Sequence, residues 1–266
     1  MNTIDRRAFL GFSGGAAALT ALPLSGCGGG GGDNFPPASL AGVGPVAVAT
    51  DGRQFQTLAT AHALAVTEKD GQKKFYGGVG TAQGKLNYPT GVAVLNGLAY
   101  VVETGNHRVQ VFDAAGKTIG TIGKGVLLYP SAIAAGKSEI FVADARNARI
   151  VAFTPEGQLT RVLGEGILSA PRGMDVMSDG VLVADPGLRK VLKLGFDGGI
   201  AMEVGADWVL PWDVATDNEF IYVADVSREE LGVTNMDGVR LGRIALASAP
   251  ANVWFRADQL SFAANV

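Results

Sequence analysis

Residues 89–116 read PTGVAVLNGLAYVVETGNHRVQVFDAAG, and this stretch decides the fold. Pro89 opens a short apolar strand, and a turn at residues 95–97 leads into a second strand, LAYVVE. The polar loop TGNHR then precedes a third strand, VQVFD. Alternating β-branched and aromatic residues between turn residues are typical of an antiparallel meander. One meander cannot bury both of its faces alone, so the pattern should recur along the chain.

The pattern does recur, about every forty residues. Prolines in matching context stand at positions 45, 89, 130, 171, 211 and 250. A second landmark follows these prolines at a constant distance: Ala59, Glu103, Asp144, Asp185, Asp225 and Ala264. Equal spacing at two landmarks predicts an all-β fold, a β-propeller of six blades, each a four-stranded antiparallel sheet.

The sixth copy stops at Val266, just after its second strand. An open ring would expose unpaired strand edges, so we expect the ring to close by mixing strands from the N- and C-termini. Residues 38–43 could supply one such strand. The alternative is a five-bladed ring, in which residues 62–79 complete the last sheet and residues 45–58 are left over.

The quoted stretch resembles the NHL repeat, whose pattern reads roughly P-x-G-V-A-V, then Y-V-A-D, then T-G-N-H-R-V-Q-V-F-D-x-x-G. The resemblance covers residues 76–246 well and the flanks weakly. Residues 78–89 resemble the linker that joins neighbouring blades in this family. The resemblance implies a propeller whose face binds a partner, usually a protein and sometimes a small molecule or RNA.

Residues 1–27 predict an export signal rather than part of the fold. Arg6 and Arg7 stand in a motif that resembles the twin-arginine (Tat) signal, and a short apolar stretch follows. The motif LSGC, ending at Cys27, resembles the bacterial lipobox, which implies cleavage before Cys27 and acylation of its sulfur. The alternatives are the Sec route and a secretory signal with an incidental cysteine. Residues 28–38 predict a Gly/Pro tether, and residues 39–266 the propeller domain.

These features predict a lipoprotein of the cell envelope, exported and anchored to the membrane at Cys27, at the outer membrane if the source is Gram-negative. The cysteine is the only one in the chain, which excludes an internal disulfide framework. With 22 basic and 25 acidic residues and a net charge of −3, the chain gives no electrostatic reason to expect nucleic acid binding.

Four carboxylates recur at one position of the repeat: Glu103, Asp144, Asp185 and Asp225. Pseudo-symmetry would place them in a ring, and clustered carboxylate oxygens suit Ca²⁺ or Mg²⁺. The favoured alternative is structural, with each carboxylate accepting backbone N–H bonds from its own loop. No other cofactor is expected.

The polar loop after the second strand contains Asn106, His107 and Arg108, and the next copy repeats the arginine as Arg149. We expect these arginines to pair with carboxylates across the blade interface. His107 and His62 are the only two histidines, and we place them in unrelated blade positions. They therefore do not predict a three-histidine metal site.

Residues directly after the repeat prolines should lie at the channel mouth: Val46, Thr90, Ser131, Arg172, Trp212 and Ala251. They differ between copies, so the repeat does not dictate them, and such positions are where a function would be grafted. We predict ligand or partner binding by Arg172, Trp212, Thr90 and Ser131, with the arginine for an anionic group and the indole for stacking.

Packing between blades is the alternative for Trp212 and the favoured interpretation of Trp208 and Trp254. No Ser-His-Asp arrangement is visible in the sequence. The leading hypothesis is therefore a non-catalytic envelope scaffold that binds a protein or a glycan. The alternative is an envelope hydrolase, lyase or lactonase with a carboxylate-held divalent metal in the channel.

Overall fold

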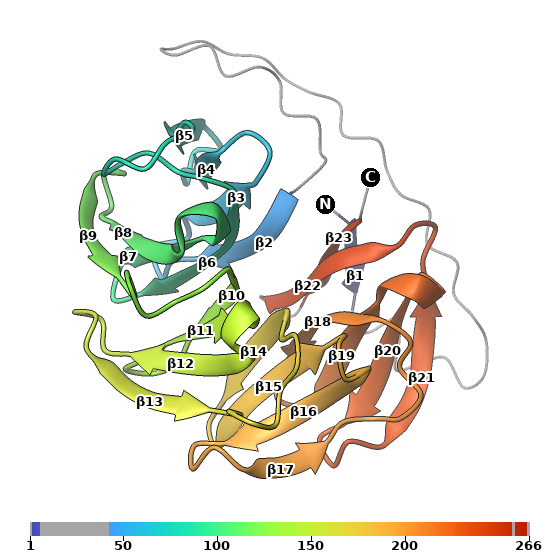
Figure 1. Ribbon diagram of the computed structural model, residues 1–266. Helices are drawn as coiled ribbons and strands as arrows, with labels where there is room; N and C mark the ends of the chain where they lie inside the picture. The colour runs from blue at the N-terminus through green and yellow to red at the C-terminus, as the bar shows by residue number, and fades with distance from the viewer. Residues whose placement is uncertain (1, 6–42, 257–258, 265–266) are drawn as a thin grey trace.

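The computed structural model describes residues 2–5, 43–256 and 259–264, which form strands and three short 3₁₀ helices (Figure 1). The 3₁₀ helices are η1 (Thr104–Asn106), η2 (Ala145–Asn147) and η3 (Val226–Arg228). Within the described part of the chain, no helix has the length and apolar character needed to cross a membrane.

Five sheets have four antiparallel strands in sequence order, and each is one blade of a propeller. Blade 1 contains β2 (Val43–Val48), β3 (Gln54–Leu58), β4 (Ala63–Thr67) and β5 (Lys73–Gly77). Blade 2 contains β6 (Pro89–Leu95), β7 (Leu98–Glu103), β8 (Arg108–Phe112) and β9 (Thr118–Ile122). Blade 3 contains β10 (Pro130–Ala135), β11 (Ile140–Asp144), β12 (Arg149–Phe153) and β13 (Leu159–Leu163).

The remaining sheets complete the circle visible in Figure 1. Blade 4 contains β14 (Gly173–Met177), β15 (Gly180–Asp185), β16 (Lys190–Gly195) and β17 (Ile200–Glu203). Blade 5 contains β18 (Pro211–Thr216), β19 (Phe220–Asp225), β20 (Glu230–Asn235) and β21 (Arg240–Ala245). A three-stranded sheet joins β22 (Pro250–Arg256), β23 (Gln259–Ala264) and β1 (Asn2–Asp5).

The innermost strands contact one another around the whole circle, in the order β2, β6, β10, β14, β18, β22 and back to β2. The predicted all-β propeller of four-stranded blades is confirmed, and its five complete blades match the number in the five-bladed alternative. The three-stranded sheet stands between blades 5 and 1 in this ring.

Strands from the two ends of the chain meet in the three-stranded sheet, as expected, but through a different segment. β1 runs antiparallel to β23, with Thr3 opposite Ser261. Of the predicted closing segment 38–43, only residue 43 is described, and it begins β2 in blade 1. Residues 62–79 also lie in blade 1, in β4 and β5, because the meander pairs each strand with its neighbour in sequence.

The turn predicted at residues 95–97 is a tight hairpin between β6 and β7. Leu95 pairs with Leu98, and the two residues between them, Asn96 and Gly97, have positive φ angles of 53° and 77°. Such angles suit asparagine and glycine and give the twist that a two-residue hairpin needs. The local sequence therefore determines this turn without help from the rest of the fold.

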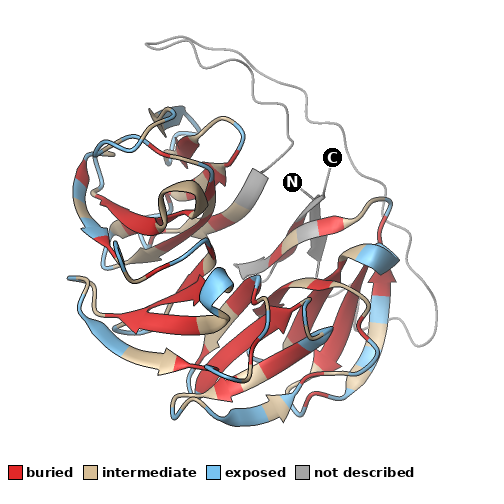
Figure 2. Cartoon of the chain, in the orientation of Figure 1, coloured by how far each residue is buried: buried red, intermediate tan, exposed pale blue. Residues whose placement is uncertain are grey.

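The hydrophobic core lies between neighbouring blades. One cluster combines Tyr100 of β7 with Val142 of β11, and the next combines Phe141 of β11 with Val183 of β15. Tyr100 and Phe141 are essentially inaccessible to solvent, and burying such a side chain stabilises the fold by roughly 1.5–3 kcal/mol. Figure 2 shows this burial, with exposed residues concentrated on outer strands such as β17.

Candidate functional site

The repeat prolines face the repeat carboxylates across the first two strands of a blade. Pro89 pairs with Glu103, Pro130 with Asp144, and Pro211 with Asp225. This pairing explains the constant distance between the two landmarks in the sequence.

A β-bulge follows the proline in these blades. The register shifts between Pro89 and Gly91, and in the same way after Pro130 and Pro211. The bulged residues are therefore Thr90, Ser131 and Trp212, which have no partner in the strand pairing. Bulges re-aim side chains, and here they turn predicted binding residues toward the channel.

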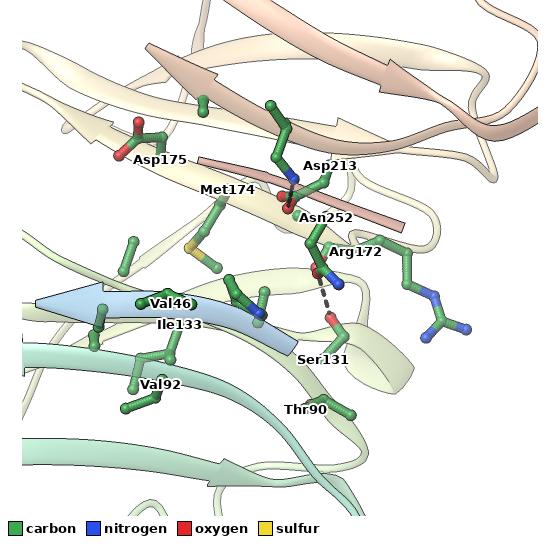
Figure 3. Close-up of a pocket in the computed structure, with 18 of the residues that line it drawn as sticks. Val46, Thr90, Val92, Ser131, Ile133, Arg172, Met174, Asp175, Asp213 and Asn252 are labelled. Atoms are coloured by element: carbon green, nitrogen blue, oxygen red, sulfur yellow. Dashed lines mark hydrogen bonds between the residues drawn. The ribbon is translucent and has the colours of Figure 1, made fainter. Parts of the chain in front are cut away.

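The innermost strands surround a cavity with a volume of about 430 Å³. Most of its lining residues are apolar, and polar or charged side chains also contribute: Thr90, Ser131, Arg172, Asp175, Asp213 and Asn252. Val46, Thr90, Ser131, Arg172 and Trp212 line the cavity, as the sequence predicts for residues after the prolines. Figure 3 shows Thr90, Ser131 and Arg172 near one end of the channel and Asp175 toward the other. In the three-stranded sheet the lining residues are Asn252 and Val253; the side chain of Ala251 lies outside the described part.

Two of the four residues predicted for ligand binding, Arg172 and Trp212, contact each other at this mouth. The guanidinium carbon of Arg172 lies 4.7 Å from the centroid of the Trp212 ring, a cation–π arrangement. Arg172 is exposed, and no described residue accepts a hydrogen bond from its side chain. Stacking uses the face of the guanidinium and leaves its N–H edge available for a carboxylate or another anion.

The hydroxyl groups at the mouth connect neighbouring blades. Thr104 donates its hydroxyl proton to the carbonyl oxygen of Pro130 at 2.7 Å, so Thr90, at 2.8 Å from Thr104, must donate to it in turn. Ser131 donates to the carbonyl oxygen of Pro171 at 2.8 Å. The hydroxyl protons of Thr90 and Ser131 are both used in these hydrogen bonds, so toward a ligand the two hydroxyl oxygens can only accept hydrogen bonds.

Two aspartates in the channel wall link three successive innermost strands, β14 to β18 and β18 to β22. Asp213 accepts a hydrogen bond from the backbone N–H of Val253 at 3.0 Å, and Asp175 accepts one from that of Thr216 at 2.9 Å. Burial raises the pKa of Asp213 to about 7, opposed by two backbone N–H groups and reinforced by the nearby charge of Asp175. Burial likewise raises the pKa of Asp175 to about 6.

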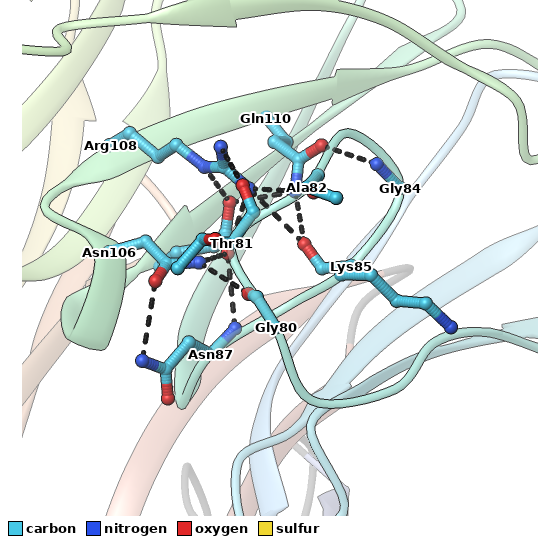
Figure 4. A network of polar contacts seen from close by, with 10 residues as sticks. Gly80, Thr81, Ala82, Gly84, Lys85, Asn87, Asn106, Arg108 and Gln110 are labelled. Atoms are coloured by element: carbon cyan, nitrogen blue, oxygen red, sulfur yellow. Dashed lines mark hydrogen bonds and ion pairs between the residues drawn. The ribbon is translucent and has the colours of Figure 1, made fainter.

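The most highly connected of the four repeated carboxylates is Glu103, which is completely buried. Figure 4 shows the polar network to which its partners Asn87, Asn106 and Arg108 belong. It accepts hydrogen bonds from the backbone N–H of Asn87 at 3.1 Å, the amide of Asn106 at 2.6 Å and the amide of Gln110 at 2.8 Å. The guanidinium of Arg108 completes its shell. These donors come from the linker before blade 2 (Asn87), the loop after β7 (Asn106) and strand β8 (Arg108 and Gln110).

The other three carboxylates make similar bonds in their own blades and are equally buried. Asp144 binds the N–H of Leu128, Asp185 that of Ser169, and Asp225 that of Val209. None of the four lines the cavity. In the described part of the chain, no group of three or more His, Cys, Asp or Glu residues could hold a metal ion. The geometry is that of loops built around a buried acceptor.

The arginine pairing differs from the expectation of contacts across the blade interface. Arg108 pairs with Glu103, and Arg149 pairs with Asp144 at 2.9 Å, both within one blade. Each arginine follows its carboxylate by five residues, and the 3₁₀ turn between them brings the two side chains together. Arg108 reaches the preceding linker instead, through the carbonyl oxygen of Thr81 at 2.8 Å.

The histidine assignment is corrected as well, because the two histidines occupy equivalent positions. His62 directly precedes β4 and His107 directly precedes β8, each the third strand of its blade. Both have left-handed backbones, and both accept a hydrogen bond at Nδ1 from the linker that leads to the next blade. The degenerate first copy hid this equivalence, since it lacks the N-H-R loop.

Trp208 packs as expected. It is 2% exposed, donates its indole N–H to the carbonyl oxygen of Val204, and stacks with Arg240 at 4.5 Å. The side chain of Trp254 lies outside the described part. Sequence reasoning missed Tyr88, which lines the cavity, and the two channel aspartates. Aspartates in otherwise apolar innermost strands were the available signal for the latter.

The NHL repeat family matches residues 86–112, which run from the end of the first linker to the end of β8. No curated protein matches the chain.

Solved structures share the fold at low sequence identity. Selenomethionine-substituted virginiamycin B lyase from Staphylococcus aureus matches with a TM-score of 0.70 and 18% identity, over 86% of this chain and 80% of that chain. Its catalytically inactive variant, in which alanine replaces a histidine, was solved with quinupristin and matches with a TM-score of 0.70 and 17% identity, over the same shares of the two chains. A chain of the nidogen/laminin complex matches with a TM-score of 0.64 and 18% identity, over 76% of this chain and 81% of that chain.

Proposed function

We propose that this NHL-repeat β-propeller is a binding scaffold without catalysis of its own, and that its ligand or partner binds at the channel mouth. The observation that carries the proposal is the pairing of Arg172 with Trp212 at the rim of the cavity. The pair presents an anion-binding edge beside an aromatic ring, where the two adjacent innermost strands β14 and β18 begin. Nothing in the repeat requires either residue.

The carboxylates of the repeat and the two histidines already make structural hydrogen bonds, and this supports a non-catalytic role. Glu103, Asp144, Asp185 and Asp225 are buried acceptors for their own linkers. The two histidines hold linkers through Nδ1 and do not line the cavity. The similar lyase is inactive when a histidine is replaced, whereas this chain offers no histidine at the channel wall.

The alternative is a hydrolase, lyase or lactonase, favoured by the fold shared with the lyases and by the raised pKa of Asp213. A divalent ion in the channel would depend on Asp175 and Asp213, the carboxylates that line it. Metal content and calcium-dependent melting decide between the two functions. Stoichiometric bound ion with a large stabilising shift would favour the enzyme, and no ion with no shift would favour the scaffold.

We also propose that the protein works in the cell envelope, exported through its twin-arginine motif and anchored at Cys27. Arg6, Arg7 and Cys27 all lie outside the described residues, so the support for this step is the sequence motif alone. Cleavage before Cys27 would also remove β1, leaving β22 and β23 as a two-stranded sheet in the processed protein. Partners of an envelope scaffold are proteins or glycans, and one structural neighbour comes from a protein complex.

Substitution of the mouth pair tests the proposal. The Arg172→Ala/Trp212→Ala double variant should capture at least about tenfold less partner from envelope extract, because the few residues that carry most of the binding energy of an interface are enriched in arginine and tryptophan. Arg146→Ala is the matched control, since Arg146 is an exposed arginine on η2 that does not line the cavity. Undiminished capture by the folded double variant would remove the channel mouth as the binding site.

A further inference from the structure

Two exposed tyrosines occupy the same position in consecutive blades. Tyr88 directly precedes Pro89, and Tyr129 directly precedes Pro130. Their φ angles are +50° and +48°, although bulky side chains avoid this region and residues before proline favour extended backbone. The two residues are 47% and 51% exposed, so burial of the rings does not compensate for the unfavourable backbone.

A histidine from the preceding blade holds each tyrosine in place. The backbone N–H of Tyr88 donates to Nδ1 of His62, and that of Tyr129 donates to Nδ1 of His107, both at 3.0 Å. The rings of His107 and Tyr129 also meet edge to face, with centroids 4.3 Å apart. The same device therefore occurs twice, at the linkers into blade 2 and blade 3.

The next two blades lack this device. There the residues before the prolines are Ala170 and Leu210, whose N–H groups donate to Asp185 and Asp225 instead. Neither residue has a positive φ angle. The strained conformation thus belongs to the histidine–tyrosine pairs and not to the repeat itself. Strain that the fold does not require points to a functional position.

The tyrosines extend the channel mouth into a longer rim. Tyr88 lines the cavity together with Thr90. Tyr129 does not line the cavity but is exposed at the corresponding position of the next blade, two residues before Ser131. Each of the two blades therefore presents an aromatic ring and a hydroxyl oxygen that can only accept hydrogen bonds. The next innermost strand along the ring is preceded by Arg172, whose guanidinium edge has no hydrogen-bond acceptor among the described residues.

Building on the proposed binding function, we propose that this rim binds an acidic polysaccharide whose sugars carry carboxylate groups. Aromatic rings offer an apolar face to the C–H groups of a sugar ring. Sugar hydroxyls supply the donors that Thr90 and Ser131 require, and a uronate carboxylate fits the edge of Arg172. A ligand of repeating units matches two equivalent subsites on neighbouring blades. Arg172 is the only basic residue among those that line the cavity, and this, with the net charge of −3, does not suit a nucleic acid.

Calorimetric titration of the full-length protein tests the ligand class. The probes are oligosaccharides of galacturonate, alginate and hyaluronan, each compared with its methyl ester. We expect one of the uronates to bind at least about tenfold more tightly than its ester, because esterification removes the charge that meets Arg172. If no uronate binds, or if the esters bind equally well, the proposal is wrong.

Variants of the rim then locate the site. Tyr88→Ala and Tyr129→Ala should each weaken binding about tenfold, whereas Tyr88→Phe and Tyr129→Phe should retain it, because the ring is preserved. Phe75→Ala is the matched control, since Phe75 is an exposed aromatic (42%) on the outer strand β5. Unchanged affinity in both alanine variants would overturn the assignment of the rim.

His107 acts through Tyr129 and is a positioning residue. His107→Ala removes the acceptor for the Tyr129 N–H and should weaken uronate binding. His107→Asn should restore it, since Oδ1 of asparagine lies where Nδ1 of histidine does and asparagine tolerates positive φ. Equal affinities of the two variants would show that the histidine does not position the rim.

Failure of this inference can be told apart from failure of the binding function. Capture from envelope extract that depends on Arg172 and Trp212, is destroyed by protease and is unaffected by Tyr88→Ala and Tyr129→Ala would overturn the polysaccharide and keep the scaffold. Capture that survives protease and requires the tyrosines supports the polysaccharide. Capture that ignores all four residues overturns both proposals.

Discussion

Asp213 lies on the innermost strand β18, and only 8% of the surface of this residue is exposed. Such burial disfavours the charged form of its carboxyl group. Gly173 on the neighbouring strand β14 leaves space for this carboxylate, because a Cβ at position 173 would collide with it. On its other side, the carboxylate accepts a hydrogen bond from the backbone N–H of Val253 on β22. Burial of the carboxylate is therefore unfavourable, and its hydrogen bond to Val253 joins two neighbouring sheets of the ring.

The raised pKa of Asp213 predicts how stability depends on pH. Aspartate in an unfolded chain has a pKa of about 3.9, whereas folded Asp213 titrates at about 7. Between these values the folded protein holds a proton that the unfolded chain has lost. The free energy of unfolding should therefore fall, by on the order of 1–3 kcal/mol, as the pH rises from about 4 to about 7.

Asp213→Asn should reduce the dependence of the free energy of unfolding on pH, because the amide does not titrate. A smaller dependence should remain, because burial also raises the pKa of Asp175. Urea unfolding at a series of pH values measures the effect. Asp70→Asn, at an exposed position, is the control and should keep the wild-type slope. Identical slopes for Asp213→Asn and the wild type would contradict the raised pKa.

At the scale of the element, the linker before blade 2 and the loop after β7 form one unit. Glu103 accepts from both, and Arg108 donates to the carbonyl oxygens of Thr81 and Ala82. The linker has one isolated bridge of its own, between Val79 and Leu86. The buried ion pair and its amide neighbours fasten the linker to the loop after β7 and to β8. Loss of the carboxylate should loosen the linker as well as the blade.

Glu103→Ala should therefore lower the free energy of unfolding by about 3–5 kcal/mol, because it leaves Arg108 buried beside an empty site. The comparison is Glu68→Ala, which breaks a pair with the exposed Lys74 and should cost less than about 1 kcal/mol. Chemical denaturation of both variants measures the difference. Equal losses would mean that Glu103 is not the acceptor that holds the linker.

At the scale of the whole molecule, the ring closes where β2 contacts β22, and β1 covers the edge of β23. The proposed lipoprotein processing would separate these two features, because β1 lies in the segment to be cleaved. Closure between β2 and β22 does not need β1. A processed propeller would keep its ring of innermost strands and expose one strand edge.

The anchoring proposal makes a prediction about location. Cys27→Ser should move the protein from the membrane fraction to the soluble fraction, because the acylated sulfur is the only anchor proposed. Fractionation and immunoblotting of the full-length protein measure the change. Protein that stays wholly in the membrane fraction despite the substitution would contradict anchoring at Cys27.

The sequence by itself determined the propeller and its channel-mouth positions. Alternating apolar residues, the Asn96-Gly97 turn and the repeated prolines act over a few residues, so their outcome can be foreseen from local order. The spacing of Pro89 and Glu103 even reflected a direct strand pairing. Strand polarity then placed Thr90 and Ser131 at one end of the channel.

Only the tertiary structure decided what each polar group does there. The histidine–tyrosine pairs, the link from Asp213 to Val253 and the stacking of Arg172 on Trp212 each join residues of different blades, about forty or fewer positions apart. The repeat determines that neighbouring blades pack against each other. Which buried polar groups form hydrogen bonds depends on the individual atoms that come together at each interface. Closure of the last sheet by β1 is likewise a contact between chain ends, which no local pattern contains.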